Sequence, residues 1–150
     1  MSSQRSEARP DAERAVWRAM RELVLERGER RPEVAQALGM SFVRIKALRF
    51  LADGPLTQQD LCGRLQSDKP YTSIVVGELE DNGYVKRTPD PDDARRRIVA
   101  LTAKGRRAAA KATEILERPP AWLAGLDADQ LQQLAAVLGQ GLFSDDSQRL

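Results

Sequence analysis

The sequence predicts a mainly α-helical fold built around a winged helix-turn-helix, with a two-stranded β-hairpin as the wing and further helices on either side. Two helix-length segments lie within residues 56–82, and each follows a residue suited to cap it. Two strand-length segments then flank a polar, proline-rich turn within residues 84–101. Amphipathic helical patterns precede and follow this region. We expect all these parts to form one structural domain.

The N-terminal part of the chain predicts two helices. Residues 1–10 show no apolar periodicity and are expected to be disordered. A long helix is predicted over residues 11–29, because its apolar side chains recur at helical spacing. Gly28 ends this helix, and a short helix closed by Gly39 follows over residues 32–38.

The central region, residues 41–101, opens with a helix that Ser41 caps and Asp53-Gly54-Pro55 stops. Thr57 then caps the first helix of the helix-turn-helix, which has one apolar stripe. After the turn Gln66-Ser67, Asp68 caps the second helix, which runs to about Asn82 and has Gly83 just past its end. The stripe of the first helix consists of Leu61, Cys62 and Leu65.

The wing is predicted as two short strands, residues 84–87 and 97–101, around a polar tip at residues 88–96. Residues 102–143 hold two more amphipathic helices, the second opened by a capping box of Asp127 and Gln130, and residues 144–150 form a frayed tail. The apolar stripes at the two ends of the chain can be buried in two ways: in a helical bundle within the chain, or against a second copy of it.

Four segments follow one another in the sequence: Leu65-Gln66-Ser67-Asp68-Lys69, Leu79-Glu80-Asp81-Asn82-Gly83-Tyr84-Val85, Pro89-Asp90-Pro91-Asp92-Asp93-Ala94-Arg95 and Leu101-Thr102-Ala103-Lys104-Gly105. In this order they resemble the MarR family of bacterial transcription regulators. The resemblance covers residues 40–118 and implies a homodimer on a pseudo-palindromic operator, usually a repressor released by a small ligand or by oxidation. It favours dimer packing of residues 11–38 and 102–143. The expected dimerisation residues are Val16, Met20, Leu23, Ile115, Leu116, Leu131, Leu134 and Leu138.

Composition argues against several classes of protein. The chain has no histidine and one cysteine, so it lacks the His or Cys clusters of a metal sensor and cannot form an intrachain disulfide. It has no glycine-rich phosphate loop, and acidic pairs such as Asp92-Asp93 lie on the hairpin, so we expect no enzyme activity and no cofactor. The first residues do not form a signal peptide, and no apolar run approaches the roughly 20 residues that cross a membrane. We therefore expect a soluble, cytoplasmic protein with no membrane partner.

The charge distribution indicates a polyanionic partner. Eight basic and three acidic residues give a net charge of +5 over residues 84–107, whereas the net charge over residues 126–150 is −3. A basic hairpin after two helices is typical of a module that reads duplex DNA. The alternative is a winged-helix module that binds protein or RNA, and that alternative predicts an apolar or acidic wing.

The second helix of the helix-turn-helix predicts a mainly apolar reading face. When its residues are placed at 100° intervals around the helix axis, the core face lies opposite a second face, which would enter the major groove. Ile74 lies at the centre of that face and suits contact with a thymine methyl, where related proteins commonly carry Arg. Gly77 can be explained either by a close approach of the helix backbone to DNA or by neutral drift of the sequence. The core residues are Thr72, Val75, Val76 and Leu79, and the major-groove residues are Lys69, Pro70, Tyr71, Ser73 and Ile74.

The wing is expected to supply much of the attraction to DNA. Asp93-Ala94-Arg95 matches the family's Asp-x-Arg signature, which implies that Asp93 braces the loop and Arg95 enters the minor groove. Arg96 and Arg97 leave this assignment open by one or two positions. Thr57, Gln58 and Arg87 are expected to contact phosphates.

The expected effector, if one exists, is a small organic ligand. Cys62 lies in an apolar stripe, so we interpret it as a small core residue and not as an oxidant sensor. By resemblance, the ligand would bind between the dimerisation helices and the winged region, lined by Trp17, Met40 and Phe42.

Overall fold

The computed structural model describes the backbone of residues 2–144, and it divides the chain into two compact units, Met1–Glu117 and Arg118–Leu150. The sequence predicted one structural domain overall. The division into two units falls just before Pro119-Pro120, where α6 has ended and the chain cannot continue as helix. The predicted tail lies outside the described residues, except for Ser144, which ends α7. Among the described helices, none combines the length and apolar character needed to span a membrane.

The first unit begins with helix α1 (Ser2–Arg21), so residues 2–10 are helical where residues 1–10 were expected to be disordered; residue 1 lies outside the described residues. The reason is that Gln, Arg, Glu and Ala favour a helix without any apolar stripe. An ion pair of 2.9 Å between Arg9 and Glu13, one turn apart, adds to this helix. The predicted long helix is also interrupted, because Glu22–Arg27 form a π-helical turn in which Arg27 pairs with Glu22 five residues away.

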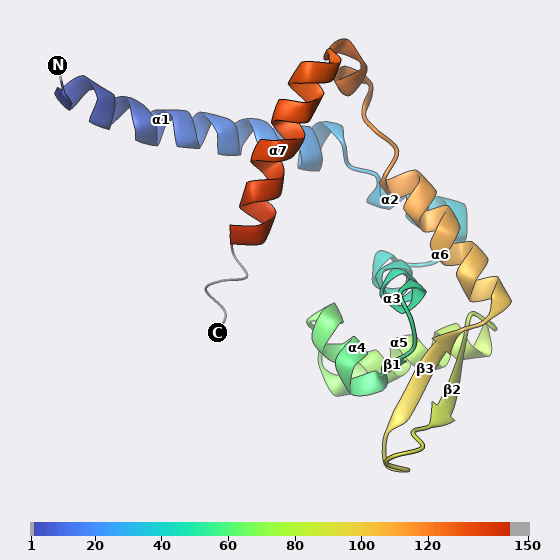
Figure 1. Ribbon diagram of the computed structural model, residues 1–150. Helices are drawn as coiled ribbons and strands as arrows, with labels where there is room; N and C mark the ends of the chain where they lie inside the picture. The colour runs from blue at the N-terminus through green and yellow to red at the C-terminus, as the bar shows by residue number, and fades with distance from the viewer. Residues whose placement is uncertain (1, 145–150) are drawn as a thin grey trace. The chain divides into compact units, whose positions relative to one another are not determined.

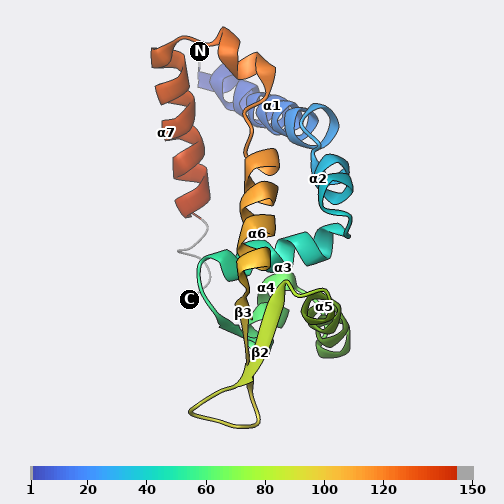
Figure 2. The same ribbon diagram turned by 90° about the vertical axis from the view of Figure 1, so that its right-hand side faces the viewer.

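Three helices form the body of the helix-turn-helix (Figures 1 and 2). They are α3 (Phe42–Ala52), α4 (Gln58–Leu65) and α5 (Lys69–Asp81). The predicted caps of α4 and α5 are present: Thr57 Oγ1 accepts from the Asp60 amide at 3.0 Å, and Asp68 Oδ1 accepts from the Tyr71 amide at 2.7 Å. Ser41 starts α3 as predicted, but its side chain makes no capping hydrogen bond. The predicted core face of α5 is buried against α3 and α4, which confirms its helical phase. This core contains Ala47, Leu48, Leu51, Leu61, Leu65, Val75, Val76, Leu79, Val85, Val99, Ala108 and Ala109.

The sheet has three strands, in the order β1-β3-β2, where the sequence predicted two. Strands β2 (Val85–Pro89) and β3 (Arg97–Leu101) form the predicted hairpin, with Arg87 opposite Val99. The additional strand β1 (Leu56–Thr57) pairs with β3, with Leu56 opposite Val99. Two residues carry no alternation pattern, so local sequence does not reveal such a strand. Figure 2 shows the β2–β3 hairpin extending beyond α4 and α5.

A second, smaller core joins α2 (Arg31–Leu38), α3 and α6 (Ala103–Leu116). Ile115 is buried in this core with Val34 and Ile45, and Leu116 packs against it. Ile115 is buried within the chain, so its side chain is not available for a dimer contact in this structure. Leu116 is half-buried, and its expected dimer contact stays a prediction.

The second unit contains a 3₁₀ turn (Ala121–Gly125) and helix α7 (Ala128–Ser144). The predicted capping box is present: Asp127 Oδ1 accepts from the Gln130 amide at 2.8 Å, and Gln130 Oε1 accepts from the Asp127 amide at 3.0 Å. Leu131, Leu138 and Leu142 remain exposed along α7, whereas Leu134 is half-buried.

Candidate nucleic-acid interface

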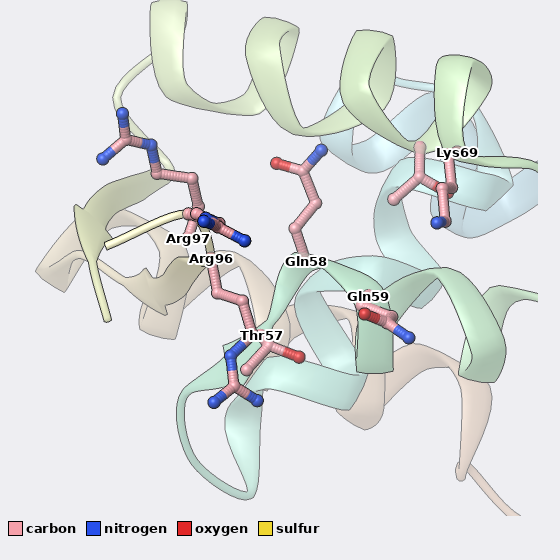
Figure 3. Close-up of a pocket in the computed structure, with 8 residues that line it drawn as sticks. Thr57, Gln58, Gln59, Lys69, Arg96 and Arg97 are labelled. Carbon is pink, nitrogen blue, oxygen red and sulfur yellow. The ribbon is translucent and has the colours of Figure 1, made fainter. Parts of the chain in front are cut away.

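A hollow of about 210 Å³ lies where the start of α4, the start of α5 and the end of the wing meet. We call it the basic hollow. Figure 3 shows Gln58 between Arg96 and Arg97 on one side and Lys69 on the other. The hollow is lined by Thr57, Gln58, Gln59, Lys69, Thr72, Arg95, Arg96 and Arg97. The structure thus brings together residues that the sequence assigned to three separate DNA contacts.

The outward face of α5 has the composition that its periodicity predicted. Lys69, Pro70 and Ser73 are exposed beside Tyr71 and Ile74, whose exposed fractions are 43% and 56%. Thr72 is the only residue of the first two turns of α5 that is fully buried and polar, and its hydroxyl donates to the Asp68 carbonyl at 2.9 Å. This bond, with a second contact of 2.7 Å to the Ser67 hydroxyl, holds the turn between α4 and α5.

Two acidic side chains of α5 are neutralised by basic residues of neighbouring elements. Glu78 pairs with Arg44 of α3. Glu80 accepts two hydrogen bonds from Arg87 of β2, from the backbone amide at 2.9 Å and from Nε at 2.8 Å. These bonds, the backbone one foremost, lower the pKa of Glu80 below its ordinary value of 4.5. Arg87 was expected to contact phosphate; in the structure its Nε pairs with Glu80, and a phosphate contact stays a prediction.

The wing tip is organised around a nearly buried carboxylate, that of Asp90. Its Oδ1 accepts from the Asp92 amide at 3.0 Å, and its Oδ2 lies 3.4 Å from Arg96 Nε. The two backbones are also joined, because the Asp90 amide donates to the Arg96 carbonyl at 3.1 Å. Arg96 therefore ties the two sides of the tip together.

Asp93 has the contacts expected of a brace. Its Oδ1 accepts from the Arg95 amide at 3.0 Å, and its Oδ2 lies 3.6 Å from Arg96 Nε. Within the described part of the chain, no carboxylate pairs with the side chain of Arg95 or Arg97. Of the three wing arginines, Arg96 is thus the one that the described carboxylates engage.

Comparison with known proteins agrees with this geometry. Residues 38–96 match the model of the MarR family. The transcriptional regulator HosA of Escherichia coli O111:H- is 38% identical over 69 residues, which cover 45% of this chain and 51% of HosA. Residues 38–96 are therefore similar in sequence to the MarR family. The match to HosA spans about half the length of that protein.

Solved structures of MarR-family proteins share the fold. Wild-type E. coli MarR in its apo form superposes with a TM-score of 0.68 at 22% identity, over 83% of this chain and 94% of MarR. The S. aureus MepR–DNA complex superposes with a TM-score of 0.56 at 23% identity, over 84% of this chain and 97% of MepR. At these identities the likeness shows a mainly helical winged-helix fold with a small antiparallel sheet.

The three residues assigned by resemblance to an effector pocket lie in two parts of the chain, and their role stays a prediction. Trp17 is 62% exposed on α1 and lines a groove made by α1 and the π-helical turn. Met40 and Phe42 pack instead against the core that joins α2, α3 and α6. Cys62 is half-buried, and its thiol donates to the Ser67 carbonyl at 3.1 Å. In the described residues, no cluster of three or more His, Cys, Asp or Glu side chains is arranged to hold a metal ion.

Sequence reasoning missed the residues that organise this site from within. Asp90 and Glu80 were not assigned a role, and Gln59 was not placed at the hollow. The spacing Asp90-x-x-Asp93-x-x-Arg96 was an available signal, since it places two carboxylates on either side of a turn that ends in an arginine. The Glu80–Arg87 pair left no such local signal.

Proposed function

We propose that this protein is a transcriptional regulator of the MarR family that binds duplex DNA, with α5 in the major groove and the wing in the minor groove. The observation that carries the proposal is the basic hollow. It joins a helix N-terminus, the reading helix and two unpaired arginines in one surface. Helix N-termini favour anions, and arginine suits the negative potential of a narrow minor groove.

The exposed apolar faces support a homodimer. Val16 on α1 and Leu131 and Leu138 on α7 are exposed in the isolated chain, and Leu23 is only half-buried. Faces of this kind gain free energy when a second copy removes them from water. In a two-fold dimer, two copies of α5 would read half-sites about 34–36 Å apart on a pseudo-palindrome.

Binding of the protein to genomic fragments of its source, followed by sequencing of the bound DNA, tests the proposal. We expect enrichment of a pseudo-palindrome, and an affinity for random duplex that falls with salt. If Lys69, Arg95 and Arg97 of both subunits each displace one counterion, the slope of log K against log[salt] is about −5. Equal or tighter binding to single strands, or no binding to any duplex, would contradict the proposal and favour a protein- or RNA-binding module.

Repression, and release by a small organic ligand, are finer proposals that rest on the family resemblance. A run-off transcription assay on the enriched fragment distinguishes repression from activation. Thermal unfolding of the protein against a panel of aromatic acids and other small organic molecules tests for an effector, because a ligand that binds only the folded state raises the melting temperature.

A further inference from the structure

The centre of the reading face is apolar and carries no charge. Ile74 and Tyr71 are exposed there, beside Pro70. A Cβ placed on Gly77, the next residue along this face, would meet no atom within 4 Å. An isoleucine at such a position exposes apolar surface to water, and a glycine there costs helix stability. This surface therefore points to a ligand that is itself apolar where it meets Ile74.

The acids that flank this face do not oppose such a ligand. Glu78 is paired with Arg44 and Glu80 with Arg87, so both carboxylates are engaged by cations of α3 and β2. Asp81 is exposed but ends α5, seven residues beyond Ile74, which is about 10 Å along the helix axis.

The charged residues around Ile74 and Tyr71 indicate what kind of ligand binds this apolar surface. The basic hollow reaches α5 at Lys69 and includes Arg95 and Arg97. An apolar protein surface would leave these cations unpaired. Duplex DNA has phosphates that can pair with the cations, and they flank a groove whose floor the apolar residues can contact. The apolar groups on that floor are the C5-methyl groups of pyrimidines.

We infer that Ile74, supported by Tyr71, contacts a pyrimidine C5-methyl group in each half-site, so that the protein recognises a methyl group there instead of a hydrogen-bonding edge. Thymine carries this methyl group, and 5-methylcytosine carries the same group at the same position of its ring. The inference rests on the proposed function and names the chemical group that this surface reads.

The test replaces thymines of the enriched duplex one at a time with deoxyuridine, which removes only the methyl group. Affinities of the full chain are measured by fluorescence anisotropy at fixed salt. We expect one thymine in each half-site at which deoxyuridine weakens binding about fourfold, the amount that corresponds to burial of one methyl group at about 0.8 kcal/mol. At the same position, a 5-methylcytosine·guanine pair should bind more tightly than a cytosine·guanine pair by a similar factor.

Variants assign the effect to Ile74. The Ile74→Ala protein should bind the thymine and deoxyuridine duplexes equally, and Ile74→Val should retain part of the difference. The matched control is Ser73→Ala, an exposed neighbour on the same helix, which should keep the full methyl dependence whatever its overall affinity. Ile74 is exposed, so a thermal unfolding curve close to that of the parent is expected for both substitutions.

Three results overturn the inference while leaving the proposed function intact. They are tight duplex binding with no deoxyuridine-sensitive position, an enriched half-site without thymine in the region that α5 covers, and methyl dependence that survives in Ile74→Ala. Failure to bind any duplex would instead overturn the proposed function and, with it, this contact.

Discussion

Arg87 donates two hydrogen bonds to the carboxylate of Glu80, from its backbone amide at 2.9 Å and from its Nε at 2.8 Å. The pair joins the last turns of α5 to strand β2. It therefore couples the reading helix to the wing, the two elements that would enter adjacent grooves of DNA. Both side chains are about one-third exposed, so the pair is screened only in part by solvent.

Replacing Glu80 with Gln should destabilise the protein by about 1 kcal/mol at neutral pH, because the charge-assisted bonds become neutral ones. The pKa of Glu80 is lowered by these bonds, so their contribution is full above the ordinary value of 4.5 and is lost as the pH falls through the lowered pKa. Urea unfolding at several pH values checks this. The parent should lose more stability than Glu80→Gln below pH 4.5; parallel curves for the two proteins would show that the pair contributes nothing.

Replacing Arg95 with Ala should weaken binding to most duplex sequences and reduce the salt slope by about one counterion, because Arg95 has no internal partner and lines the basic hollow. The measurement is affinity against salt concentration. Lys111→Ala is the matched control, since it removes the same charge from α6, where Lys111 pairs with Glu114 at 3.2 Å. An unchanged slope in Arg95→Ala would move the minor-groove role to Arg97.

Replacing Arg96 with Ala should loosen the wing tip, because the carboxylate of Asp90 is only 9% exposed and would lose the cation 3.4 Å away. Amide hydrogen exchange should accelerate over residues 90–96, and affinity for DNA should fall with it. A role for Arg96 in direct DNA contact predicts the opposite pattern: weaker binding with unchanged exchange in the free protein.

Replacing Gly77 with Ala should stabilise the free protein and weaken its complex with DNA. Alanine favours a helix interior over glycine by up to about 1 kcal/mol, and a Cβ at this position meets no atom of the chain within 4 Å. If the backbone approaches the groove closely, the added methyl group must push the two apart. Thermal unfolding and DNA affinity are measured on the same variant, and a gain in both would show that the glycine has no role in recognition.

Replacing Leu134 with Asp should dissociate the proposed homodimer, because Leu134 belongs to the apolar stripe of α7 and is only half-buried within the chain. Light scattering at micromolar concentration should show a smaller particle, with weaker DNA binding alongside. Gln133→Asp adds the same charge at the neighbouring exposed position and should leave the dimer in place. A parent chain that is monomeric under these conditions would remove the basis of this prediction.

Local sequence was sufficient for the features that depend on neighbours within a few residues. The caps at Thr57, Asp68 and Asp127 are formed as their residue types predict, since each side chain reaches an amide three residues ahead. The phase of α5 followed from its apolar spacing, because helical periodicity alone decides which side chains share a face. The hairpin followed from a polar turn between two apolar segments.

Only tertiary packing decided the contacts between elements far apart in the chain. Strand β1 exists because Leu56 lies beside Val99, and Ile115 is a core residue because α2 and α3 cover it. Tertiary packing also decided which basic side chains are paired. Arg87, Arg95 and Arg96 carry the same charge, but among the described residues the fold brings carboxylates only to Arg87 and Arg96. A sequence shows how many cations a segment holds, whereas the distance to each carboxylate, which the fold sets, determines which of them remain for DNA.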